Sequence, residues 1–291
     1  MANYDSGIET IPLWKENIPN YRESGEENII EIVDDNANYN LIVKPEITVF
    51  KPAKLNTNGQ AVLIVPGGGY VGVSYIWEGY DIAKWLNSHG ITAIVLKYRL
   101  PHAKSNIIPH RSPLLDASRA MKIIRANAKN WGIDENNTGV MGFSAGGHLA
   151  STLGTHYDME YGYPKDELDE LSDRPDFMVL AYPVISMSAD FTHEGSRHFL
   201  LGENPSDELK DFYSSEYNIT GKTPVTFLVH AGDDEVVDVK NSIVFYENLR
   251  KKGVEAELHI FQRGGHAFAL ANGPGMPKIW RQLCINWLKN R

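Results

Sequence analysis

A serine lies between two glycines in the run Gly142-Phe143-Ser144-Ala145-Gly146, which has the pattern G-x-S-x-G. Residues 137–142 before it are typical of a strand, and the residues from Ala145 onward are typical of a helix. At such a turn the chain reverses sharply, and the two glycines remove clashes with the neighbouring elements. The pattern therefore predicts that Ser144 is a nucleophile, held at a strained strand-to-helix turn with its hydroxyl exposed.

A serine hydroxyl becomes a good nucleophile only when a base removes its proton, so this hypothesis requires a histidine. Hydrolases with this turn place their acid and then their base after the serine in the chain. His266 fits that order, because it follows Gly264 and Gly265 between the last predicted strand and the last predicted helix. The two glycines would let this loop bring the imidazole to the carboxyl end of the sheet, where open α/β sheets build their sites.

The other histidines in the second half of the chain have structural interpretations or no supporting pattern. His148 is expected to pack on the helix that follows Ser144, and His259 belongs to the last predicted strand. His230 ends the strand before an acidic loop, where we expect it to form hydrogen bonds. Three more lie in or near predicted loops, namely His156, His193 and His198.

The acid that orients the imidazole should follow the strand that precedes the last one, and three aspartates lie there. Its role is to accept a hydrogen bond from the ring N–H, which fixes the tautomer and stabilises the imidazolium. Asp234 is the preferred acid and Asp233 is the alternative. Asp238 is expected to cap the helix that begins near Val239.

A run of three glycines, Gly67-Gly68-Gly69, predicts where the oxyanion would bind. The run follows the apolar strand 61–65, and glycines let backbone N–H groups approach a substrate closely. We expect the donors to be the N–H of Gly68 or Gly69, together with the N–H of Ala145 after the nucleophile. A phosphate-binding loop is the competing interpretation, and it fails because neither G-K-[ST] nor the G-x-G-x-x-G spacing is present.

The elements that would position these residues alternate between strand and helix, which favours a mostly parallel central sheet with helices on both faces. Strands are expected at residues 29–33, 41–50 with a break at Pro45, 61–65, 91–96, 137–142, 177–182, 225–230 and 255–261. Helices are expected around residues 82–86, at 113–129, from 145, at 240–251 and at 277–289. We expect one domain over residues 1–291, with an irregular N-terminal arm at 1–27 and an insertion at 183–222, before the acid-bearing strand, that serves as a lid or substrate loop.

Composition excludes several classes of partner and cofactor. The formal net charge is −9 with no long Lys/Arg cluster, which argues against nucleic acid, and no apolar segment is long enough to span a membrane. The single cysteine, Cys284, excludes an intrachain disulfide and a multi-cysteine metal site. The acidic residues 158–173 match no calcium loop, so we expect neither metal nor cofactor.

Residues 1–18 lack the pattern of a signal peptide, so a cytoplasmic protein is expected. Oligomeric state stays open.

Taken in order along the chain, several motifs resemble one group of α/β-hydrolases. They are Pro66-Gly67-Gly68-Gly69-Tyr70, Lys97-Tyr98-Arg99-Leu100-Pro101, the run 142–150, Arg174-Pro175-Asp176-Phe177, the run 182–187, Leu200-Leu201-Gly202, the run 230–237 and Gly264-Gly265-His266. The group contains acetylxylan-esterase-like and other carbohydrate esterases, some of which are labelled endo-xylanase-like. Many of its members have proline at the position of Asp238 and glycine at the position of Ala267.

This resemblance implies an α/β-hydrolase fold and a cofactor-free Ser144–His266–Asp234 triad. It also implies removal of small acyl groups, usually acetyl, from sugars or simple esters, so a small-molecule ester is the expected partner. Three alternatives stay open: a serine peptidase, a lipase or carboxylesterase acting on non-sugar esters, and a non-catalytic binding protein on the same fold.

Overall fold

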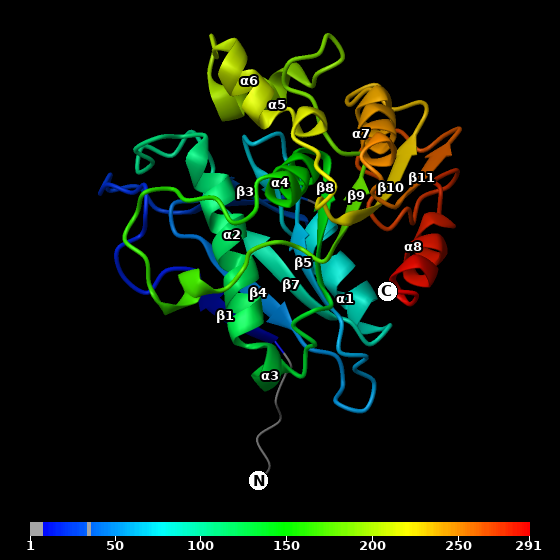
Figure 1. The fold of residues 1–291 in the computed structure, drawn as a ribbon, viewed down its shortest axis with the longest axis horizontal. Helices are drawn as coiled ribbons and strands as arrows, with labels where there is room; N and C mark the ends of the chain where they lie inside the picture. The colour runs from blue at the N-terminus through cyan, green and yellow to red at the C-terminus, as the bar shows by residue number, and fades with distance from the viewer. Residues whose placement is uncertain (1–7, 34–35) are drawn as a thin grey trace.

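The computed structural model describes residues 8–33 and 36–291, and its centre is a twisted sheet flanked by helices (Figure 1). Within the described residues this sheet has eight strands in the order β1-β4-β7-β5-β8-β9-β10-β11. The strands from β7 to β11 run parallel, whereas β4 is antiparallel to both of its neighbours, β7 and the edge strand β1. Their bounds are β1 (Ile8–Pro12), β4 (Glu46–Phe50), β5 (Ala61–Val65), β7 (Thr92–Lys97), β8 (Thr138–Phe143), β9 (Phe177–Ala181), β10 (Val225–Ala231) and β11 (Ala256–Phe261).

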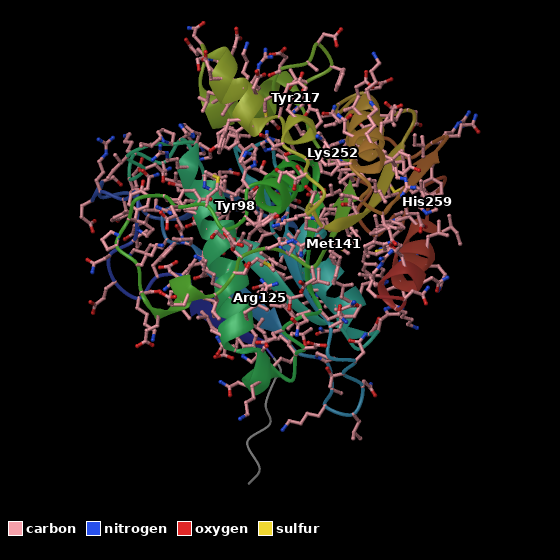
Figure 2. All side chains as sticks on the ribbon, in the orientation of Figure 1. Tyr98, Arg125, Met141, Tyr217, Lys252 and His259 are labelled. Atoms are coloured by element: carbon pink, nitrogen blue, oxygen red, sulfur yellow. The ribbon has the colours of Figure 1, made fainter. Side chains whose placement is uncertain are left out.

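Helices cover both faces of the sheet, which explains why β5, β7, β8 and β9 are near-continuous apolar runs, buried throughout. The helices are α1 (Asp81–Asn87), α2 (Arg111–Ala126), α3 (Ala128–Trp131), α4 (Ser144–Thr155), α5 (Glu194–Leu201), α6 (Asp207–Tyr213), α7 (Lys240–Lys251) and α8 (Trp280–Leu288). On one face α1 and α8 meet through Trp85 and Trp280, whose ring centroids are 5.4 Å apart. On the other face α4 packs against α2 and over β8 and β9. Figure 2 shows Met141 of β8 deep among these side chains, whereas Tyr217 and His259 lie at the periphery. The fold is the expected mostly parallel sheet with helices on both faces.

The prediction of an irregular N-terminal arm at residues 1–27 was wrong in part, because residues 8–12 form the strand β1. This strand pairs antiparallel with β4 and extends the sheet by one edge strand. Its first three residues are exposed, and Pro12 can be tolerated because an edge strand leaves N–H groups unpaired. So short and exposed a strand carries little hydrophobic pattern, which is why the sequence did not indicate it. Residues 1–7 lie outside the described residues.

The expected strand 41–50 is also two separate elements. Its second half is β4, and its first residue ends β3 (Asn36–Leu41), which forms a small sheet with β2 (Ile29–Val33) and β6 (Val73–Ser74). Pro45 lies in the bend between the two sheets, where its missing N–H costs nothing.

The insertion at residues 183–222 contains α5 and α6 instead of irregular chain, and Figure 1 shows both helices together at the top of the molecule beside α7. Asn241, in the first turn of α7, binds the backbone at the beginning of this insertion. The Asn241 amide oxygen accepts from the N–H groups of Ile185 and Ser186 at 2.9 and 3.1 Å, and its nitrogen donates to the carbonyl of Phe191 at 3.3 Å. None of the helices in the described part of the chain is long and apolar enough to cross a bilayer.

His148 packs inside α4, as expected from its place on that helix. It is fully buried, its Nε2 lies 2.7 Å from the carbonyl oxygen of Tyr213, and its Nδ1 lies 2.7 Å from the hydroxyl of Tyr70. A carbonyl can only accept, so Nε2 carries the proton and Nδ1 accepts from the tyrosine. Burial lowers the pKa of His148 to about 4, although the hydrogen bond to Tyr213 opposes the shift.

This buried histidine predicts a pH dependence of stability. Between pH 6.5 and 4 the unfolded chain binds a proton at this residue that the folded chain does not. The stabilisation that comes from keeping His148 neutral is therefore fully present above about pH 6.5. As the pH falls toward 4 it is lost, and the free energy of unfolding decreases by at most about 1.4 kcal/mol per pH unit. Urea unfolding at several pH values should show a steeper fall in the free energy of unfolding for the wild type than for His148→Asn. Equal slopes for the two proteins would contradict this account.

Candidate active site

Ser144 stands in a sharp turn between the end of β8 and the start of α4. Its φ angle is +50°, in the left-handed region that costs a non-glycine residue strain. A side chain at Gly142 would lie 2.4 Å from the carbonyl oxygen of Gly146, and one at Gly146 would lie 2.1 Å from the carbonyl oxygen of Val65. The two glycines of the pattern are therefore required by contact with backbone, so that α4 can pack directly over β5 and β8.

Loops from three strands bring Ser144, His266 and Asp234 together. The Nε2 atom of His266 lies 2.8 Å from the Oγ of Ser144, and its Nδ1 lies 2.7 Å from an oxygen of Asp234. The Ser144 residue is 7% exposed, whereas the side chains of His266 and Asp234 are 14% and 0% exposed. Since Asp234 can only accept, Nδ1 carries the proton and Nε2 is free to accept the proton of the serine hydroxyl.

The carboxylate of Asp234 accepts four hydrogen bonds. One oxygen accepts from the N–H groups of Val236 and Val237, both at 2.9 Å, and the other accepts from His266 and from Nε2 of His230, at 3.2 Å. Burial opposes ionisation, but the hydrogen bonds from His230, His266 and Val237 outweigh it and hold the pKa of Asp234 well below its usual value. The group is therefore ionised at neutral pH, as a partner for an imidazolium must be. His230 is the hydrogen-bonded neighbour that the sequence indicated.

The other two aspartates of this loop have different contacts. Asp233 accepts from the N–H of Gly265 at 2.8 Å and so fastens the loop that carries His266. Asp238 accepts from the N–H of Lys240 at 2.9 Å, at the beginning of α7. Of the three, Asp234 is the one in contact with the imidazole.

The glycine loop lies directly beside the serine. A side chain at Gly67 would come within 2.9 Å of the Cβ of Ser144, so this loop approaches as closely as a backbone can. The carbonyl oxygen of Gly68 accepts from the N–H groups of Val71 and Gly72 at 3.1 and 3.0 Å, which closes the loop on itself. The N–H groups of Gly68, Gly69 and Ala145 donate to no acceptor among the described residues. They are free to bind an oxyanion.

Three aromatic residues that follow the glycines have different surroundings. Tyr70 and Tyr75 are buried and bind His148 and Thr48 through their hydroxyls, so they belong to the core. Trp77 is 36% exposed, and its indole N–H donates to the carbonyl of Ala267 at 2.9 Å. Its ring therefore lies at the rim of the site, beside the loop of His266.

Asp116 forms a structural ion pair with Arg99 and not with Arg119, which is its neighbour on α2. Its carboxylate receives hydrogen bonds at 2.8–3.2 Å from the guanidinium of Arg99, and both side chains are fully buried. Arg119 pairs instead with Asp166 in the acidic segment.

Two residues at the site were missed from the sequence, Glu78 and Tyr182. The carboxyl group of Glu78 is buried and contacts Gly67, and the hydroxyl of Tyr182 contacts Glu78 from the end of β9. The available signals were a lone acidic residue in the aromatic segment Tyr75-Ile76-Trp77-Glu78-Gly79-Tyr80, and a tyrosine at the carboxyl end of a predicted strand.

This sheet order, with the serine at the strand-to-helix turn and the histidine after the last strand, defines an α/β-hydrolase. The chain belongs to the BD-FAE family, whose model matches residues 47–249. The resemblance to acetylxylan-esterase-like hydrolases that the sequence motifs indicated is thereby confirmed.

Individual relatives agree with this family. The acetylxylan esterase of Xylanibacter ruminicola is 36% identical over 85% of this chain and 48% of its own length. The endo-1,4-beta-xylanase B of Butyrivibrio fibrisolvens is 38% identical over 73% of this chain and 33% of its own length. The chain thus spans half or less of these two proteins. An acetyl ester-xyloside bifunctional hydrolase from Caldicellulosiruptor lactoaceticus matches over 97% of this chain and 96% of that one, with 39% identity and a TM-score of 0.84.

The contacts of the two neighbouring aspartates predict different effects of the same substitution. Asp234→Asn would present an amide to the imidazole and favour the wrong tautomer, so we expect kcat for an ester to fall by about 10³–10⁴. Asp233→Asn keeps an oxygen for the N–H of Gly265, and its effect should stay below about tenfold. Steady-state kinetics on both folded variants measures the difference. A larger loss in Asp233→Asn would assign the acid to Asp233 instead.

Proposed function

We propose that the protein is a serine-dependent carboxylic ester hydrolase that removes acetyl groups from sugars. The observation that carries this proposal is the continuous set of hydrogen bonds from Ser144 through His266 to Asp234, beside free backbone N–H groups. In this assignment Ser144 is the nucleophile, His266 is the general base and acid, and Asp234 orients the imidazole.

The first half of the reaction acylates the serine. As the Oγ of Ser144 attacks the ester carbonyl, Nε2 of His266 takes the hydroxyl proton. The N–H groups of Gly68 or Gly69 and of Ala145 bind the oxyanion of the tetrahedral intermediate. His266 then gives its proton to the leaving alcohol, and the acyl group stays on Ser144.

The second half returns the enzyme to its starting state. Water takes the place of the alcohol and loses a proton to His266 as it attacks the acyl carbonyl. The resulting intermediate collapses to a carboxylic acid and free Ser144, which regains its proton from the imidazolium. Asp234 stays ionised throughout, so the transient positive charge on His266 always has a buried carboxylate 2.7 Å from Nδ1.

Two observations support an acetylated sugar as the substrate. The proteins similar to this chain include an acetylxylan esterase and an acetyl ester-xyloside bifunctional hydrolase. In addition, Trp77 lies partly exposed beside the His266 loop, and exposed aromatic faces of this kind suit the apolar face of a sugar ring. The insertion 183–222 would then cover part of the substrate, as a lid or substrate loop, and a cytoplasmic location stays a prediction.

Hydrolysis of a xyloside bond has less support in this chain, although the names of two relatives, the bifunctional hydrolase and the xylanase, include it. Glycosidases use two carboxyl groups that face the scissile bond, one as an acid and one as a base or nucleophile. The two buried carboxyl groups at this site, those of Asp234 and Glu78, both have their oxygens engaged by internal donors. We therefore assign the site to ester bonds.

Replacing the nucleophile tests the proposed function directly. Ser144→Ala should lower the hydrolysis of p-nitrophenyl acetate by about 10⁵ or more, because only uncatalysed attack and oxyanion binding remain. The variant should also lose labelling by a fluorophosphonate probe, while its unfolding curve stays close to that of the wild type. Retained turnover in the purified variant would overturn the assignment.

Replacing Trp77 tests the sugar. We expect Trp77→Ala to raise KM for acetylated xylo-oligosaccharides by about tenfold, since ring stacking is lost. KM for ethyl acetate, which has no ring, should change by less than about threefold. Trp77→Phe keeps an aromatic face but loses the hydrogen bond to Ala267, so it separates stacking from support of the loop. Equal changes for both substrates would argue against a sugar at this position.

A further inference from the structure

A second buried carboxyl group, that of Glu78, lies beneath the proposed active site and has no role in the reaction as described so far. The residue is 2% exposed and stands in a single π-helical turn, Ile76–Tyr80, between the glycine loop and α1. It forms no ion pair with a lysine or arginine of the described chain. Burying a carboxylate without a cation is costly unless hydrogen bonds compensate, so the partners that it does have are informative.

One oxygen of Glu78 holds the glycine loop. Its Oε2 accepts from the N–H of Gly67 at 2.8 Å. Gly67 is the residue that approaches the Cβ of Ser144, and its carbonyl accepts from the N–H of Ser74 at 2.9 Å. This hydrogen bond therefore fixes the loop whose next two N–H groups are the proposed oxyanion donors.

The other oxygen of Glu78 reaches the histidine loop through Tyr182. The hydroxyl of Tyr182 donates to Oε1 at 2.8 Å and accepts from the N–H of Ala269 at 3.1 Å. The ring of Tyr182 stands edge-on to that of His266, with centroids 5.0 Å apart. Tyr182 is fully buried directly after β9, and its N–H donates to the carbonyl of Val229 in β10 at 2.7 Å, so the sheet holds its backbone.

We propose that Glu78 is a positioning residue for ester hydrolysis, whose two carboxylate oxygens hold the glycine loop and the histidine loop in place around Ser144. The inference rests on the proposed function, and deepens it. Asp234 holds His266 from one side, through Nδ1. Glu78 and Tyr182 hold the chain on the other side of the histidine, at Ala269, and the glycine loop with it. The oxyanion donors and the base are thus tied to one buried group.

The charge of Glu78 also acts on His266. Three ionisable groups from three segments act electrostatically on the imidazole or respond to its charge: Asp234 after β10, Glu78 before α1, and His193 at the start of α5. Tyr182 is a neutral neighbour, because burial raises its pKa well above the usual value. Burial also raises the pKa of Glu78, while the hydrogen bonds from Tyr182 and Gly67 and a positive charge on His266 lower it. By reciprocity, an ionised Glu78 favours the imidazolium that forms in the reaction.

Two variants distinguish the effect of the hydrogen bonds that link Glu78 to the loops from the effect of its negative charge. Glu78→Gln has nearly the same shape, but its amide turns one acceptor into a donor and removes the charge. We expect kcat for p-nitrophenyl acetate to fall by about 10–100-fold with KM within about threefold, because the lost interactions matter most in the transition state. The acidic limb of the kcat/KM profile should move to lower pH, since His266 loses a nearby negative charge. Tyr182→Phe keeps both ring and charge, so kcat should fall by about 3–30-fold with the acidic limb unmoved.

Tyr98→Phe is the matched control. Tyr98 is as buried as Tyr182, and its hydroxyl donates to the carbonyl of Pro66 at 3.0 Å, next to Gly67. Removing the Tyr98 hydroxyl takes away a hydrogen bond to the residue that precedes the glycine loop, but no hydrogen bond to Glu78. We expect its kcat to stay within about threefold of the wild type. Each rate is divided by the concentration of active sites, titrated with a fluorophosphonate, so that a merely unstable variant loses sites but not kcat.

The inference is overturned if both Glu78→Gln and Tyr182→Phe keep kcat per active site within twofold of the wild type, or if Tyr98→Phe loses as much as they do. If Glu78→Gln does not fold, Tyr182→Phe decides by the same criterion. Inactive wild-type protein would instead count against the proposed function, because that result does not depend on Glu78.

Discussion

The structure depends on one backbone constraint, the left-handed conformation of Ser144 at the point where β8 becomes α4. A residue can be held there only if the helix starts immediately and packs against the sheet, which forces Gly142 against Gly146 and Gly146 against the backbone of β5. The same contact brings the loop after β5 against the serine. The strained serine and the close glycine loop are therefore consequences of one packing arrangement, and neither can be changed without the other.

Parallel strand order explains how the remaining groups reach the serine. Loops after β5, β9, β10 and β11 all leave the carboxyl edge that also carries Ser144. Each contributes one side chain or N–H group with a partner on another loop, as Asp233 does for Gly265 and Tyr182 does for Ala269. Hydrogen bonds between the loops hold the site together, and the sheet determines only where each loop begins.

This division decides what could be predicted from the sequence. Ser144 and His266 could be found because Ser144 lies between two glycines and His266 follows two glycines, each after a predicted strand, a pattern that follows from local packing. Asp234 could be preferred to Asp233 only from its spacing, since both lie in one loop and differ in which partner they face. Glu78 could not be found, because its importance comes from contacts with residues 11 positions before it and 104 positions after it. The edge strand β1 escaped for a related reason, since its pairing partner lies far along the chain.

Glu78 and Asp234 also differ in how their burial is compensated, and this difference assigns their roles. Four donors converge on Asp234, two of them backbone N–H groups, so its charge is stabilised whether or not His266 is protonated. Glu78 has two donors for its two oxygens. An acid that must stay charged beside an imidazolium requires the first arrangement. A group that must hold two loops in place requires the arrangement of Glu78, because each of its oxygens binds one loop and has no second donor among the described residues.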